Sequence, residues 1–151
     1  MSLRERFTQS MKDAMKAGDK SRLGTIRMMQ AALKDRDIEA RGAGKEVSEE
    51  DILALLQKMV KSRQESLGMF EQAGREDLAA QERGEIAVIL DFLPTQMSDD
   101  EVKAAIAVAM SETGAASMKD MGKVVGALKA KFTGQMDFAK ASALVKAALN
   151  G

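Results

Sequence analysis

Lysines gather near the C-terminal end of this chain, where six of them accompany only two acidic residues after position 118. They are Lys119, Lys123, Lys129, Lys131, Lys140 and Lys146. Each lysine carries an ammonium group with three hydrogen-bond donors and no acceptor, which suits the phosphate oxygens of RNA. Affinity for RNA at such a surface would fall with salt, because each neutralised phosphate releases counterions. The same lysines could form an ordinary solvated helix face, and both interpretations stay open.

Two glycines lie among these lysines, four residues apart in a predicted helix. Gly122 and Gly126 should each cost about 1 kcal/mol of helix stability relative to alanine. Such residues persist where a neighbouring backbone or a ligand comes close. We favour close packing of the last helix over the approach of an RNA backbone. Gly134 is expected to end the helix in the left-handed conformation, and Asp137 to cap the next helix.

Most enzyme chemistry is excluded by residues that the sequence lacks. There is no cysteine and no histidine, which removes thiol catalysis, the Ser-His-Asp triad and a tetrahedral zinc site. No phosphate-binding Gly-Lys-Ser/Thr loop and no Gly-x-Gly-x-x-Gly pattern is present. We therefore predict no catalytic residue, no metal and no cofactor.

Two acids in the middle of the chain are the remaining candidates for a carboxylate site. Glu82 and Glu85 are three residues apart and could act as paired carboxylates or as oxygen ligands for a divalent ion. We favour a solvated face on which they form ion pairs with Arg75, Arg83 or Lys61. Arg75 could instead anchor a partner, although pairing with neighbouring acids is preferred.

The composition predicts an all-α protein. Apolar residues make up 45% and charged residues 30% of the 151 positions, with a single proline. Alternating runs of β-branched or aromatic residues, which favour β-strands, are absent from the sequence. No apolar stretch of about 18 residues exists to span a membrane, and the start of the chain has no apolar signal core. We expect a cytoplasmic protein with no membrane partner.

Helical stripes divide the chain into two expected parts. Residues 1–93 should form a four-helix N-terminal bundle, with Ser48 capping its longest helix. Pro94 stops the fourth helix, and the stretch Ser98-Asp-Asp-Glu101 is a capping box that starts the next one. Residues 98–151 should then form a small three-helix C-terminal domain.

Charge is balanced overall but unevenly distributed. Residues 1–45 hold eleven basic against six acidic residues, residues 46–101 hold five against fourteen, and residues 119–151 hold six against two. Nucleic-acid binders are usually more basic as a whole. Strong nonspecific binding is therefore unfavourable, whereas a local basic patch at either end is possible.

Several segments resemble the GatB/YqeY family in order and spacing across nearly the whole chain. They are Ala14–Leu23, Ser62–Phe70, Ala73–Leu78, Glu82–Glu85, Leu90–Ser98 and Lys119–Asp137. The last of these is similar to the tail of the B subunit of the glutamine-dependent aspartyl/glutamyl-tRNA amidotransferase. At Gln135 this chain departs from the family pattern, which often has a basic residue after the loop glycine.

The resemblance implies a partner and an activity class. It associates the chain with carbon–nitrogen ligases that use glutamine as amido-nitrogen donor, in which the tail faces tRNA and catalysis lies in another domain. We therefore expect a non-catalytic tRNA-binding or accessory module. The alternative is a protein-interaction scaffold of helices with no nucleic-acid role, and a free-standing enzyme is the least favoured of the three.

Overall fold

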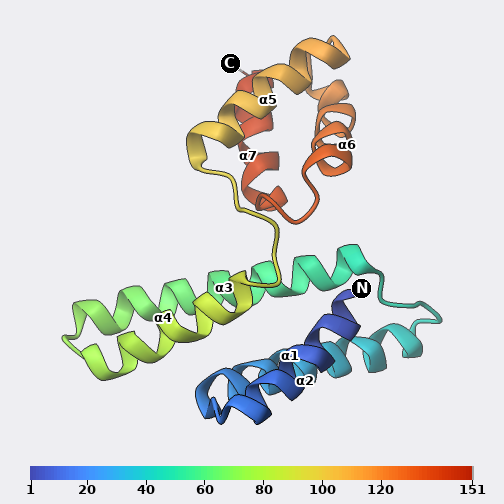
Figure 1. The fold of residues 1–151 in the computed structure, drawn as a ribbon. Coiled ribbons are helices and arrows are strands. Elements are labelled where there is room, and N and C mark those ends of the chain that lie inside the picture. The colour runs from blue at the N-terminus through green and yellow to red at the C-terminus, as the bar shows by residue number, and fades with distance from the viewer. Residues whose placement is uncertain (151) are drawn as a thin grey trace. The chain divides into compact units, whose positions relative to one another are not determined.

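The computed structural model describes residues 1–150, and all regular structure in that range is helical (Figure 1). This confirms the all-α prediction. The chain folds into two compact units, Met1–Pro94 and the segment from Thr95 onward. Within the described range, no helix is both long enough and apolar enough to cross a bilayer.

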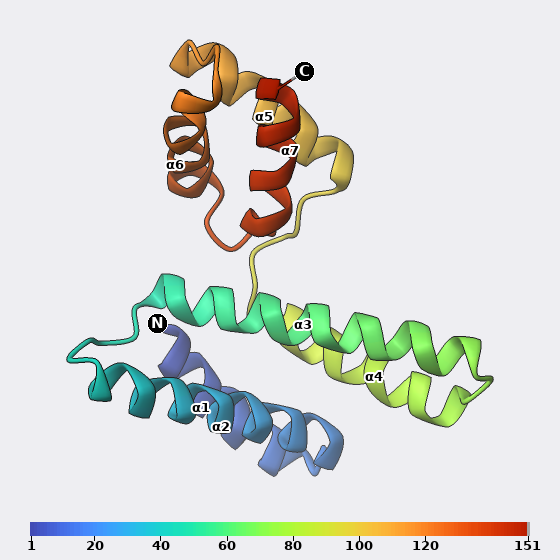
Figure 2. The ribbon, with the colours of Figure 1, turned by 180° about the vertical axis from the view of Figure 1, so that it is seen from behind.

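The N-terminal unit contains four helices, α1 (Leu3–Ala17), α2 (Lys20–Gly42), α3 (Glu49–Gln72) and α4 (Glu76–Leu90). Helix α1 packs on α2, and α3 packs along α4, as both views of the ribbon show (Figures 1 and 2). Helix α2 also contacts α3 and α4, which joins the two pairs. The shared core consists largely of aliphatic and methionine side chains, including Ile26, Met29, Ile52, Leu56 and Ile89.

Two aromatic side chains pack against each other in this unit, just beyond the end of α4. The ring of Phe92 meets the ring of Phe7 edge-on, with centroids 5.0 Å apart. The guanidinium carbon of Arg6 lies 5.3 Å from the centroid of the Phe92 ring. Arg6 also donates a 2.9 Å hydrogen bond to the backbone carbonyl of Asp91. Because Phe7 and Arg6 lie on α1, these contacts fix the end of α4 against the first helix.

Helix boundaries follow from local chemistry. Ser48 and Asp51 form a capping box at the start of α3, and Ser98 and Glu101 form another at the start of α5 (Asp99–Thr113). In each box the serine hydroxyl accepts from the third helical amide, and the acidic side chain accepts from the serine amide. Both helix starts were predicted from the sequence and are confirmed.

The C-terminal unit consists of α5, a short 3₁₀ turn (Met118–Asp120), α6 (Met121–Phe132) and α7 (Phe138–Asn150). Helices α6 and α7 run antiparallel and side by side (Figures 1 and 2). Their core contains the fully buried Val124, Leu128, Ala141 and Val145. Small and aliphatic side chains therefore bring the two helices together on their inner faces.

The loop between α6 and α7 is held from both sides. Gly134 has a φ of +77°, the left-handed conformation expected of it. The carboxylate of Asp137 accepts hydrogen bonds from the first amides of α7, as predicted. The loop carbonyls of Gly134 and Gln135 accept from Gln96 Nε2 and the Met97 amide, at 2.7 Å and 2.9 Å. The segment that precedes α5 is thus hydrogen-bonded to the α6–α7 loop.

Candidate nucleic-acid interface

The outward face of α6 presents a glycine between two lysines. Lys123 precedes Gly126 by three positions and Lys129 follows it by three, so both side chains flank this glycine on the helix surface. All three residues are exposed, as is Gly122 one turn earlier. This arrangement offers a flat strip of backbone bordered by positive charge.

The glycines of this face have no packing partner. A Cβ atom added at Gly122 or Gly126 would meet no heavy atom within 4 Å. The packing explanation that we favoured is therefore wrong, because α7 contacts α6 through the opposite side, where Val124 and Leu128 are buried. The approach of a ligand to these glycines remains a prediction.

Helix α7 repeats the same arrangement. Lys140 precedes Ala143 by three positions and Lys146 follows it by three, and all three residues are exposed. Ala141 and Val145, which point inward, are fully buried. Two adjacent helices thus each carry two lysines six residues apart, with a small residue between them. We call these two surfaces the lysine faces of α6 and α7.

Acidic residues neutralise only part of this charge. Lys140 Nζ lies 2.7 Å from Asp99 Oδ1, and this hydrogen bond raises the pKa of the lysine and lowers that of the carboxyl. Lys123 Nζ is 4.0 Å from Asp120 Oδ1, at the limit of an ion pair. Lys129 and Lys146 have no ion pair with any carboxylate in residues 1–150. Their ammonium groups face water, where an anion can reach them.

The structure does not bring all six candidate lysines together. Lys119 is exposed in the 3₁₀ turn before α6. Lys131 lies two residues beyond Lys129, which places it on the other side of α6. There it lines a groove between α5 and α6 together with Glu101 and Glu112. We therefore assign the lysine faces to Lys123, Lys129, Lys140 and Lys146 alone.

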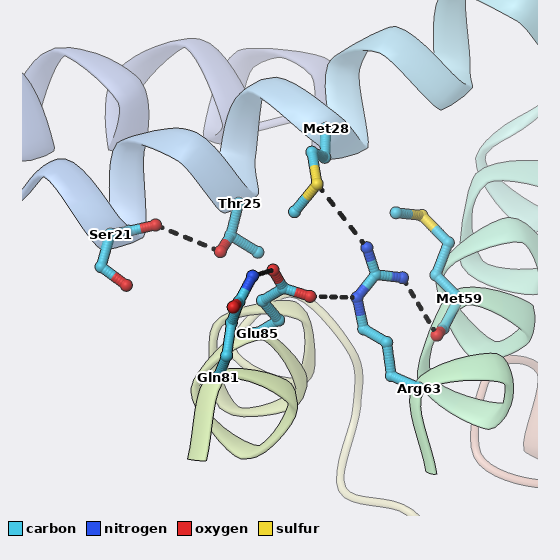
Figure 3. Close-up of polar contacts among 7 residues, drawn as sticks. All are labelled: Ser21, Thr25, Met28, Met59, Arg63, Gln81 and Glu85. Atoms are coloured by element: carbon cyan, nitrogen blue, oxygen red, sulfur yellow. Dashed lines mark hydrogen bonds and ion pairs between the residues drawn. The ribbon is translucent and has the colours of Figure 1, made fainter. Parts of the chain in front are cut away.

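The N-terminal unit holds a second polar site, around Arg63 on α3 (Figure 3). Arg63 Nε lies 3.0 Å from Glu85 Oε2 on α4, and the two side chains are only 17% and 15% exposed. Arg63 also donates to the Met59 carbonyl at 3.3 Å and lies 3.9 Å from Met28 Sδ. The other Glu85 oxygen accepts from Gln81 at 3.4 Å. Arg63 therefore contacts all three helices, and this cluster ties α2, α3 and α4 together.

These contacts correct the expected partners of the acidic residues. Glu85 pairs with Arg63 rather than with Arg75, Arg83 or Lys61. Arg83 instead bonds Glu71 and Glu76, and Arg75 bonds Asp77, a neighbouring acid as preferred. Within residues 1–150, no three acidic side chains converge to hold a metal ion.

The sequence did contain a signal for the Arg63–Glu85 pair. The two residues are equally distant from Gly74, the left-handed residue of the turn between α3 and α4. In an antiparallel helix pair, positions equidistant from the turn lie opposite each other. Reading α3 and α4 as a hairpin about Gly74 would have predicted this ion pair.

Comparison with known proteins places these features in a family. Residues 4–149 match the family described as Yqey-like protein. The chain is also similar to three fungal proteins that share the name "Altered inheritance of mitochondria protein 41, mitochondrial". The relative from Pyrenophora tritici-repentis is 29% identical over 132 residues, which cover 83% of this chain and 71% of that protein.

The two yeast relatives match over shorter stretches. The protein from Vanderwaltozyma polyspora is 29% identical over 75% of this chain and 63% of its own length. The protein from Saccharomyces cerevisiae is 32% identical over 60% of this chain and 49% of its own length. The match therefore spans about half the length of that last relative.

These relatives contradict the expected cytoplasmic location, because all three are named as mitochondrial proteins. The expectation was based on the missing apolar spans and the missing apolar signal core. Neither property distinguishes one reducing, aqueous compartment from another. With a family match that covers residues 4–149, the chain belongs to the YqeY-like family.

Proposed function

We propose that this chain is a non-catalytic accessory of tRNA-dependent amidation that binds tRNA through the lysine faces of α6 and α7. The observation that carries the proposal is the repeated spacing on these helices, where a small residue lies between two exposed lysines. The resemblance of Lys119–Asp137 to the tail of the amidotransferase B subunit supports tRNA as the RNA concerned.

The geometry of α6 suits a phosphate backbone. Gly126 leaves the helix surface without a side chain, so a sugar-phosphate chain can approach the helix closely. Lys123 and Lys129 then lie on both sides of it and can donate to phosphate oxygens. Six residues of helix rise by about 9 Å, so the two ammonium groups can reach different phosphates.

The charge distribution within the unit supports an oriented contact. Helix α5 carries four acids, Asp99, Asp100, Glu101 and Glu112, against the single Lys103. Helices α6 and α7 carry five lysines and no acid. An RNA strand is attracted to the second surface and repelled by the first, which favours one orientation over many.

Of the two candidate acids, Glu85 is engaged in a contact between helices. The mostly buried Glu85 accepts hydrogen bonds from Arg63 and Gln81, and its pairing with Arg63 leaves no free carboxylate base at this position. The chain has no histidine or cysteine to serve as nucleophile. An accessory role in binding, with the amidation performed by another protein, is consistent with both facts.

A salt series tests this proposal. The anisotropy of fluorescently labelled tRNA is measured against the wild-type chain, the variant K123A/K129A and the control K12A/K58A. The control removes two exposed lysines from α1 and α3, so the net charge changes equally. We expect micromolar binding at low salt, lost in K123A/K129A and retained in the control.

The salt dependence adds a second readout. Each lost phosphate contact should reduce the slope of log affinity against log salt by about one, so K123A/K129A should differ from wild type by about two. No binding at low salt, or equal losses in both variants, would refute the proposal.

A further inference from the structure

Helices α5 and α6 enclose a groove that the lysine faces do not include. Its volume is ≈ 400 Å³, within the usual range for binding clefts. The floor is apolar and is formed by Met97, Ala104, Ala105, Val108, Ala109, Ala127, Leu128 and Phe132. Val108 is 50% exposed there, although valine is usually buried. This surface is apolar enough to gain free energy from being covered.

The α5 side of the groove follows one helical stripe. Glu101, Ala105, Val108 and Glu112 recur at intervals of three and four residues, so they lie along one face of α5. A glutamate stands at each end of this stripe, about 16 Å apart along the helix. Lys131 lies on the opposite side of the groove, on α6.

Both glutamates are available as charges. Glu101 accepts a hydrogen bond from the Ser98 amide, which holds the pKa of this carboxyl below its usual range. Glu112 is exposed and forms no ion pair with another residue of the described chain. The α5 edge of the groove is therefore acidic at both ends, and only the α6 edge is basic.

We infer that this groove binds an amphipathic α-helix of a partner protein, with basic residues about three turns apart on the edge that faces α5. Three turns of helix span the distance between Glu101 and Glu112. The apolar stripe of such a helix covers Val108 and the floor, in the manner of helix-in-groove recognition. An anionic lipid or acyl chain fits less well, because two glutamates oppose its charge and one lysine attracts it. This site is independent of the proposed tRNA surface.

A pair of designed peptides tests the inference. Each is a labelled helix of about 15 residues with leucines at positions i, i+4, i+7 and i+11, and it carries either lysines or glutamates on one flank. Fluorescence anisotropy measures their binding to the full chain. We expect the lysine peptide to bind and the glutamate peptide to bind at least about five times more weakly.

Two adjacent positions on α5 provide a matched pair of variants. In V108Q the floor loses its exposed apolar side chain, and we expect binding of the lysine peptide to weaken about five- to tenfold. In A107Q the same side chain is introduced one residue away, at an exposed position outside the groove, and binding should be unchanged. Both positions are on the surface of α5, so neither variant should unfold the chain.

Charge reversal at the rim completes the test. E112K should weaken the lysine peptide and strengthen the glutamate peptide, each by about two- to fivefold. K123A/K129A should leave peptide binding unchanged, which separates this site from the RNA surface. Equal binding of both peptides, or no effect of V108Q, would overturn the inference. So would self-association of the chain that V108Q abolishes, because the occupant would then be a second copy.

Discussion

The two units use their positive charges in different ways. In the N-terminal unit, six of the nine arginines are bonded to acids of the same unit. These pairs are Arg4–Asp37, Arg22–Asp91, Arg36–Glu39, Arg63–Glu85, Arg75–Asp77 and Arg83 with Glu71 and Glu76. The C-terminal unit has no arginine at all, and most of its lysines face water. The difference therefore lies in the arginines, because the N-terminal unit pairs most of them with acids, whereas the lysines of both units are exposed.

The residue types explain this difference. The guanidinium of arginine is planar and can bond a carboxylate through two nitrogens, as Arg4 does with Asp37 at 2.9 Å and 2.6 Å. Such pairs have defined geometry and suit contacts between helices. Lysine is a flexible point charge that is strongly hydrated, which suits contact with a mobile or irregular anion. This difference supports the proposal that the C-terminal unit is the binding unit, with the N-terminal unit as its scaffold.

The largest expected effect is loss of the aromatic closure in the scaffold unit. Replacing Phe92, which is 3% exposed, with alanine should lower the free energy of unfolding by about 3–5 kcal/mol. The cause is a cavity where Phe92 meets Phe7. Urea unfolding followed by circular dichroism measures the free energy of unfolding, and M69A at a 69% exposed site is the control. A loss below about 1 kcal/mol would show that this closure does not hold the unit together.

The second prediction concerns the mostly buried ion pair. R63M should lower the free energy of unfolding by about 2 kcal/mol, because the Glu85 carboxylate is left with little access to water. R75M should cost less than about 0.5 kcal/mol, because Arg75 and Asp77 are more than half exposed. Chemical denaturation of both variants gives the comparison. Similar costs would mean that the arginines of this unit do not differ as their burial implies.

The third prediction compares one glycine from each unit. Gly84 on α4 and Gly126 on α6 both lie in helix interiors, and an added Cβ would meet no atom within 4 Å at either. G84A and G126A should each raise the free energy of unfolding by up to about 1 kcal/mol. Only G126A should weaken tRNA binding, because its methyl group lies between Lys123 and Lys129. Unchanged tRNA affinity in G126A would exclude close approach of RNA at this glycine.

The smallest effect is a shared response to acid. Hydrogen bonds from Arg4 and Lys140 hold the pKa values of Asp37 and Asp99 below the usual range. These two ion pairs therefore stabilise the fold fully above about pH 4, the pKa of an aspartate in the unfolded chain. Their contribution is lost as the pH falls through the lower pKa of each aspartate in the folded chain. The midpoint temperature of thermal unfolding should therefore be constant between about pH 8 and 5 and fall below about pH 4.

Substitutions separate the two units in this experiment. D37N removes one titrating group from the N-terminal unit and D99N removes one from the C-terminal unit. Each variant should reduce the fall of the midpoint temperature at low pH, and only in the thermal transition of its own unit. An acid decline unchanged in both variants would show that these ion pairs do not contribute to the pH dependence.

The fold was largely predictable because its signals are local. The capping boxes at Ser48 and Ser98 and the left-handed glycine Gly134 each act within one helical turn. Helix α4 ends at Leu90, four residues before the stop that was expected at Pro94. The contacts between helices were harder to predict, because they depend on register. Arg63 and Glu85 are 22 residues apart and required the turn at Gly74 as a reference. The groove at Val108 was missed because a single exposed valine gives no signal in the sequence.

The candidate site was only partly predictable, for the same reason. All six lysines were identified by type, but the sequence did not show that Lys131 lines a groove between α5 and α6. The absence of a packing partner at Gly122 and Gly126 also depends on which side of α6 meets α7. Helical spacing places residues on a face, whereas tertiary contacts decide which face is covered.

The most direct test of the binding unit is an NMR titration of the ¹⁵N-labelled chain with unlabelled tRNA. We predict that the largest amide shifts fall on the lysine faces of α6 and α7, around Gly126 and Ala143. Amides of α1 to α4 and of the groove around Val108 should change little. Shifts concentrated on the N-terminal unit, or no shifts at low salt, would contradict the assignment of tRNA binding to the C-terminal unit.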